Sequence, residues 1–124
     1  RIQDKARGVG FDWEKKEDVW AKVKEEEGEL ETEFNAIDTA ATDEDKAAAR
    51  DRAEEELGDM LFALVNAGRL YKLNPDTALE RTCAKFRRRF TYLEEHTIRE
   101  GRDLHDMTLA EMDAIWDEAK SKGL

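Results

Sequence analysis

The sequence has little of what breaks helices, cross-links chains or crosses membranes. One proline and seven glycines occur in 124 residues, which predicts few and long secondary-structure elements. The single cysteine, Cys83, excludes an internal disulfide and fits a reducing compartment. No run approaches the ~18 apolar residues of a membrane span, and no signal-peptide pattern opens the chain. We therefore expect a cytoplasmic protein.

Positive charge is also scarce. The chain has 21 Lys and Arg against 31 Asp and Glu, a net charge of −10. This balance argues against binding to nucleic acid or to an anionic membrane surface, because both need many cations. A strongly anionic ligand would need a metal ion or a local basic cluster. The first residue is Arg rather than Met, so we expect a fragment of a longer chain.

Hydrophobic periodicity indicates helices throughout. Apolar residues make up 40% and charged residues 42%, a balance that suits amphipathic helices. We expect an all-α, four-helix bundle that forms a single domain over 1–124. An extended arm over 1–15 would pack Phe11 and Trp13 on the bundle. The stretch MLFALVNAG at 60–68 is apolar nearly all round, so we expect it in the most buried helix. The predicted helices span about 16–37, 46–72, 75–99 and 109–122.

Local signals support these helix bounds. Thr42 or Asp43 can cap the second helix, and Pro75 suits the first position of the third. Thr108 and Glu111 form a capping box before the fourth. In the third helix we expect a buried apolar stripe, formed by Leu79, Phe86, Phe90 and Leu93.

Two acid-rich stretches have matching spacing. Glu26 and Glu29 share a helix face, with Glu25 beside them, and Glu56 and Asp59 share a face on the next helix. If the two helices pack antiparallel, four carboxylates converge and repel one another. A hard divalent cation, Mg²⁺ or Mn²⁺, would resolve this repulsion.

The acids admit other interpretations. A solvated acidic face is the alternative that composition leaves open. Gly28 and Gly58 beside the acids suggest either close backbone approach or room for a ligand. A di-iron site needs Glu-x-x-His pairs, and neither His96 nor His105 follows an acid by three positions. An EF-hand is excluded because the acids lie on helices rather than in a loop.

One basic stretch, CAKFRRRF at 83–90, stands out in the acidic chain. Lys85 and Arg89 fall to one side of the expected apolar stripe and, beside a metal site, could hold phosphate groups. Trp116 could stack on a base, and Lys120 could add a phosphate contact. Charge balance and core packing are the alternatives for these residues. Asn66 continues the stripe that contains Asp59.

These motifs together resemble the MazG family of nucleoside triphosphate pyrophosphohydrolases. Glu-Glu-x-x-Glu at 25–29, followed by Glu-x-x-Asp at 56–59, is similar to the family's signature. Three longer stretches, VGFDW at 9–13, EEELGDMLFALVN at 54–66 and KFRRRFTYLEE at 85–95, resemble the carboxy-terminal domain of bacterial MazG proteins. The resemblance covers nearly the whole chain. Gly28, at the fourth position of the first motif, departs from the family pattern.

The resemblance implies Mg²⁺-dependent hydrolysis of nucleoside triphosphates to a monophosphate and pyrophosphate. It also implies a homodimer, or a higher assembly, with sites close to the subunit interface. We expect water to attack the α-phosphorus, with Glu25 orienting or deprotonating it and with loose base specificity. By this match the metal-binding acids are Glu26, Glu29, Glu56 and Asp59, and the residues near the nucleotide are Lys85, Arg89, Trp116 and Lys120. We expect Asn66, together with Trp116, to meet the base or the sugar.

Two other functions stay open on the sequence. One is a narrower pyrophosphohydrolase that acts on dUTP, dCTP or phosphoribosyl-ATP. The other is a non-catalytic helical dimerisation module, in which the acids would be solvated and metal would change nothing.

Overall fold

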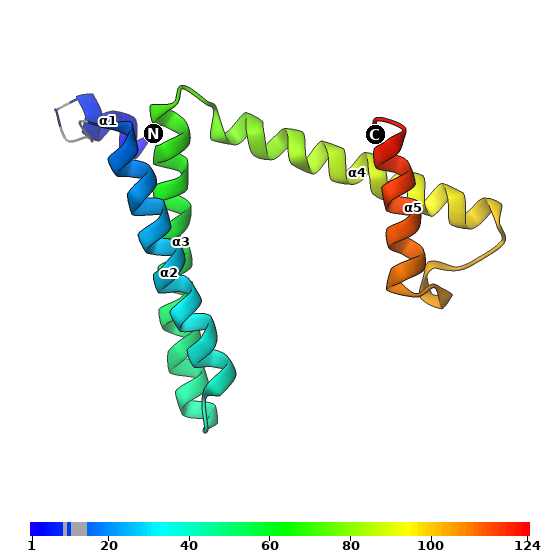
Figure 1. Ribbon diagram of the computed structural model, residues 1–124, viewed down its shortest axis with the longest axis horizontal. Helices are drawn as coiled ribbons and strands as arrows, with labels where there is room; N and C mark the ends of the chain where they lie inside the picture. The colour runs from blue at the N-terminus through cyan, green and yellow to red at the C-terminus, as the bar shows by residue number, and fades with distance from the viewer. Residues whose placement is uncertain (9, 11–14) are drawn as a thin grey trace. The chain divides into compact units, whose positions relative to one another are not determined.

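The computed structural model describes residues 1–8, 10 and 15–124. All regular structure in this part of the chain is helical, and no strand occurs in it, which confirms the all-α class (Figure 1). Residues 1–8, 10 and 15–124 contain five α-helices, where four were predicted, together with one 3₁₀ turn. The elements in order are α1 (Ile2–Gly8), α2 (Lys16–Thr39), α3 (Asp43–Leu70), α4 (Pro75–Arg99), η1 (Leu104–Asp106) and α5 (Leu109–Ser121).

The additional helix, α1, corrects the expected extended arm. Residues Ile2–Gly8 are helical rather than extended. The side chain of Gln3 is buried, and its Nε2 donates a hydrogen bond of 2.8 Å to the backbone oxygen of Phe62 in α3. This tertiary contact stabilises a helix that is too short to be stable alone. Phe11 and Trp13, which were expected to pack on the bundle, lie outside the described residues.

The chain divides into two compact units, Arg1–Pro75 and Asp76–Leu124. Each unit is described below by itself. The four-helix bundle and the single domain over 1–124 therefore stay predictions. The bounds of the four long helices differ from the predicted ones by at most three residues.

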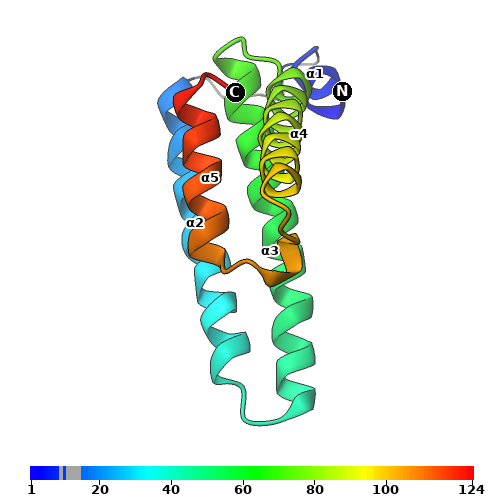
Figure 2. The same ribbon diagram turned by 90° about the vertical axis from the view of Figure 1, so that its right-hand side faces the viewer.

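In the first unit, α2 and α3 form an antiparallel hairpin (Figures 1 and 2). A short loop joins them, and Thr42 caps α3 as expected, because its Oγ1 accepts a hydrogen bond of 3.0 Å from the backbone N–H of Asp45. Val19 and Val23 of α2 pack against Ala63 and Ala67 of α3. The small alanine side chains let the two helices approach closely at this level.

The prediction that residues 60–68 lie in the most buried helix is wrong, because most of the large side chains of this stretch are exposed. Only one stripe of this stretch, which contains Ala63 and Ala67, is buried by α2. The opposite side of α3 carries an apolar surface, hereafter the outer face, that is 43–54% exposed. A helix in a two-helix hairpin can bury only one stripe against its neighbour. The outer face consists of Leu57, Leu61, Leu64 and Val65.

The second unit holds most of α4, with η1 and α5. Thr108 and Glu111 form the predicted capping box, in which each side chain binds the other's backbone N–H. The small core of this unit consists of Leu93 of α4, Met107 directly after η1, and Ile115 of α5. Of the apolar stripe expected in α4, only Leu93 is buried. The other three side chains are 40–66% exposed in the single chain: Leu79, Phe86 and Phe90.

None of the described helices is long and apolar enough to cross a membrane.

Candidate metal and nucleotide site

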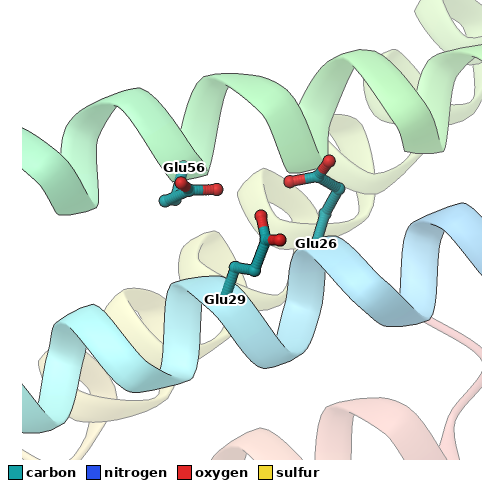
Figure 3. A group of neighbouring side chains, drawn as sticks. All are labelled: Glu26, Glu29 and Glu56. Atoms are coloured by element: carbon teal, nitrogen blue, oxygen red, sulfur yellow. The ribbon is translucent and has the colours of Figure 1, made fainter.

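Three glutamates from the two helices of the hairpin meet at one place. Glu26 and Glu29 are three positions apart on α2 and so leave the helix on one side, facing Glu56 of α3 (Figure 3). One carboxylate oxygen from each residue lies within 4.8 Å of the other two. The predicted convergence of acids from two antiparallel helices is therefore present for these three residues.

Glu26 is the most deeply buried acid of the cluster, with 5% of its surface exposed. Its Oε1 lies 2.8 Å from the Nζ of Lys22, one turn earlier on α2. This ion pair holds the pKa of Glu26 below its ordinary value and raises that of Lys22. The other oxygen, Oε2, is buried and has no hydrogen-bond partner among the described residues. Glu26 is thus a charged carboxylate with one oxygen left unpaired.

Glu56 has the opposite electrostatic character. Burial, the adjacent Glu29 and the charge of Asp59 raise its pKa to about 7. Its Oε2 is also buried without a partner in the described part of the chain. Without a cation, Glu56 therefore keeps its proton to a much higher pH than an ordinary glutamate does.

The donor set fits a hard divalent cation. Carboxylate oxygens are the ligands that Mg²⁺ and Mn²⁺ prefer, and three of them face one another here. A buried polar atom without a partner is costly. The two buried Oε2 atoms, of Glu26 and Glu56, are therefore what a bound cation would satisfy.

The two glycines near the acids do not mark a close backbone approach. Apart from the neighbouring backbone of its own helix, neither has an atom within 4 Å of where a Cβ would stand. Of the two interpretations of Gly28 and Gly58, close approach is wrong, and the space beside both residues is open.

The two other acids that were predicted to belong to the site, Asp59 and Glu25, are not part of the cluster of three. Asp59 is exposed and acts on the pKa of Glu56 through its charge, but it is not among the three acids that meet. Glu25 is exposed, and its carboxylate lies 3.5 Å from the Nζ of Lys22. The roles of Asp59 as a ligand and of Glu25 as a water-orienting residue stay predictions.

The predicted phosphate and base contacts belong to the second unit, except Asn66. Arg89 and Trp116 meet there: the guanidinium carbon lies 6.0 Å from the centroid of the indole ring, and Nε donates a 2.9 Å hydrogen bond to the backbone oxygen of Leu124. Lys85 and Lys120 are exposed. The substrate roles of these residues stay predictions.

Sequence reasoning missed two cations in the first unit. Lys22 neutralises Glu26, and its position four residues before that acid was the available signal. Arg69 is 13% exposed in its side chain, and its Nη2 donates a hydrogen bond of 2.6 Å to the Oδ1 of Asn66. The three-residue spacing to Asn66 was visible, but the burial of Arg69 was not.

The structure thus has an antiparallel helical hairpin with a carboxylate cluster between its helices, an arrangement whose donor set fits a divalent cation. A sequence model of the MazG nucleotide pyrophosphohydrolase domain matches residues 14–93, which is most of the chain. The chain therefore belongs to this family, and the resemblance recognised from its motifs is confirmed.

Relatives agree with this assignment. The chain is 35% identical over 120 residues, 97% of its length, to the nucleoside triphosphate pyrophosphohydrolase/pyrophosphatase MazG of Thermotoga maritima. It is 34% identical over the same length to the nucleoside triphosphate pyrophosphohydrolase of Escherichia coli K12. A stretch of 65 residues, 52% of the chain, is 57% identical to the uncharacterized protein YabN of Bacillus subtilis. The matches span 42% of the first two relatives and 13% of the third.

Proposed function

We propose that this chain hydrolyses nucleoside triphosphates to nucleoside monophosphate and pyrophosphate, with Mg²⁺ held by Glu26, Glu29 and Glu56. The observation that carries the proposal is the carboxylate cluster with two buried and unpaired oxygens. The names of the Thermotoga and Escherichia relatives supply the reaction. Mn²⁺ has the same oxygen preference and should substitute.

Mg²⁺ held by Glu26, Glu29 and Glu56 would supply Lewis-acid chemistry to the phosphate groups and to water. The chain's own residues prepare this place. Lys22 keeps Glu26 ionised, so that a ligand with full charge is available at neutral pH. Asp59 adds negative charge beside Glu56 and is proposed as a further ligand. Glu25, exposed at the edge of the cluster, is proposed to orient or deprotonate the attacking water.

The cationic side chains would hold the charge of the substrate and the leaving group. Lys85 and Arg89 are proposed to bind the β- and γ-phosphates, where they would stabilise pyrophosphate as it leaves. Trp116 and Asn66 would contact the nucleoside part, and Lys120 would add a phosphate contact. Because an acidic site repels a free triphosphate, the substrate should arrive as its metal complex.

A homodimer is part of the proposal. The four large apolar side chains of the outer face are 43–54% exposed, and large apolar patches on single chains commonly mark interfaces. A second copy of the chain is the proposed occupant, because the same face repeated by two-fold symmetry is complementary to itself.

Product analysis tests the reaction. The protein is incubated with each dNTP and NTP, with and without Mg²⁺, and monophosphate, pyrophosphate and orthophosphate are measured. Metal-dependent formation of monophosphate and pyrophosphate in equal amounts is expected. Orthophosphate with diphosphate would move the attack to the γ-phosphorus, and the absence of turnover on every nucleotide would favour the non-catalytic module.

A pair of variants tests the site. Glu56→Gln should abolish turnover, because it removes a charged ligand while leaving the helix intact. Glu54→Gln is the matched control: it makes the same change two residues earlier on α3, at an exposed position, and should retain activity. Equal activity of the two variants would refute the assignment. Turnover of dUTP, dCTP or phosphoribosyl-ATP alone would favour the narrower enzyme.

A further inference from the structure

Asn66 is held by a neighbour that no motif identifies. It lies on α3 with 8% of its surface exposed, and the guanidinium of Arg69 donates a 2.6 Å hydrogen bond to its Oδ1. The two residues are three positions apart, so they stand on adjacent turns of one helix. This distance is short for an N–H···O bond, as expected when the donor carries a charge.

Helix α1 holds Arg69 from its other side. The carboxylate of Asp4 lies 3.7 Å from the Nε of Arg69, and one residue earlier Gln3 donates to the backbone oxygen of Phe62. Phe62 is one turn before Asn66, so α1 lies over the turn that carries the amide. Arg69 therefore lies between Asp4 of α1, with which it forms an ion pair, and Asn66, and its side chain is 13% exposed.

The chemistry of this contact fixes the direction of the amide. A guanidinium has five N–H donors and no acceptor, so only the oxygen of Asn66 can face it. The opposite end, Nδ2, is then the end that can meet a ligand, and it can only donate. We propose that Arg69 is a positioning residue that makes Asn66 a dedicated hydrogen-bond donor, and that Asn66 recognises an acceptor atom on the nucleoside part of the substrate.

The place of Asn66 on α3 suits this role, which rests on the proposed function. Asn66 follows Asp59 by seven residues, which puts it on the same helix face and about 10 Å further along the axis. A nucleotide with its phosphates at the acids could therefore reach Asn66 with its sugar or base. Purine N3 and pyrimidine O2 are acceptors on the same edge of every base. A donor at Asn66 is thus compatible with a site that accepts several bases.

Two variants and one control test the inference by kinetics. Asn66→Asp keeps the size of the side chain and an oxygen for Arg69, but it replaces the donor by an acceptor. We expect a loss of roughly 10- to 100-fold in kcat/KM, because a buried hydrogen bond is replaced by repulsion between two acceptors. Arg69→Met should raise KM with little change in kcat, because the amide loses its fixed direction. Arg52→Met is the control, since it breaks the 2.7 Å ion pair with Glu33 between α2 and α3 far from Asn66.

Substrate analogues separate positioning from a general loss of structure. One analogue is a purine nucleoside triphosphate with carbon in place of N3, which removes the acceptor on the base. The other is a 3′-deoxynucleoside triphosphate, which removes the 3′-hydroxyl of the sugar. The unaltered protein should discriminate against one of them, which identifies a base or a sugar acceptor. Asn66→Asp should lose that discrimination, and Arg69→Met should weaken it, whereas Arg52→Met should keep it.

The outcomes are distinct from those for the reaction itself. If the protein turns over nucleotides but Asn66→Asp matches it in kcat/KM, the inference is wrong and the proposed function stands. If Arg69→Met is folded and still discriminates against the analogue as strongly as the unaltered protein does, the positioning role is refuted. If the unaltered protein turns over no nucleotide, the proposed function fails and the inference fails with it.

Discussion

Glu56 makes a quantitative prediction about cation binding. Its pKa of about 7 means that the metal-free site carries a proton there at low pH, and a cation must displace this proton. Mg²⁺ binding should therefore release about 0.9 proton per site at pH 6, about half a proton at pH 7 and about 0.1 at pH 8. The apparent affinity should fall by about fivefold from pH 7 to pH 6 and by about tenfold per pH unit below that.

Isothermal titration calorimetry measures this release directly. The observed enthalpy of Mg²⁺ binding is plotted against the ionisation enthalpy of several buffers, and the slope gives the number of protons released. The slope should decrease from pH 6 to pH 8. Glu56→Gln has no proton to lose at this position, so any binding that it retains should have a slope near zero at every pH. Glu54→Gln should reproduce the slopes of the unaltered protein.

The same pKa sets the pH dependence of stability without metal. The pKa of Glu56 in the folded protein is above its ordinary value of 4.5, so folding favours the protonated form. This contribution to stability is fully present below pH 4.5 and is lost as the pH rises through about 7. Two calorimetric results would refute this account of the site. One is a proton-release slope that does not change with pH, and the other is the same slope for Glu56→Gln and the unaltered protein.

Three other predictions concern the scaffold. The pKa of Glu111 is lowered, mainly by its hydrogen bond from Arg102 and also by the one from the backbone of Thr108. These interactions therefore stabilise the fold above pH 4.5, and their contribution is lost as the pH falls further. Glu111→Gln should therefore flatten the acid side of a plot of urea-unfolding stability against pH. Thr108→Ala should cost about 1 kcal/mol of stability in urea, because it removes the cap of α5. Leu61→Glu on the outer face should shift the mass measured by light scattering from dimer to monomer, and an unchanged mass would argue against this interface.

The helices could be predicted from the sequence because their signals are local. Thr42 and Thr108 act as caps at the predicted positions, and α4 begins at Pro75. Each of these signals depends on a few neighbouring residues and on backbone hydrogen bonds within one turn. Helix α1 could not be predicted in this way. Its seven residues depend on tertiary contacts such as the one from Gln3 to Phe62, between residues far apart in the sequence.

The carboxylate cluster could be predicted in part. The three-residue spacing of Glu26 and Glu29 places both on one face, and a short loop brings α3 back antiparallel so that Glu56 faces them. Helix periodicity does not give the depth of burial. It therefore could not tell that the pKa of Glu56 would be raised while that of Glu26 is lowered, or that Arg69 would be largely covered and hydrogen-bonded to Asn66.

The apolar pattern of α3 shows most clearly what a sequence leaves undecided. Periodicity tells which side chains must leave water, but not which surface covers them. Here the sizes of the side chains carry the missing information. Ala63 and Ala67 face α2, where close helix packing needs small residues, whereas the outer face carries leucines and a valine. Large apolar side chains gain more free energy from burial than alanine does, because they remove more apolar surface from water. On this account α2 covers the face with small side chains, and the proposed second copy of the chain would cover the outer face with its large ones.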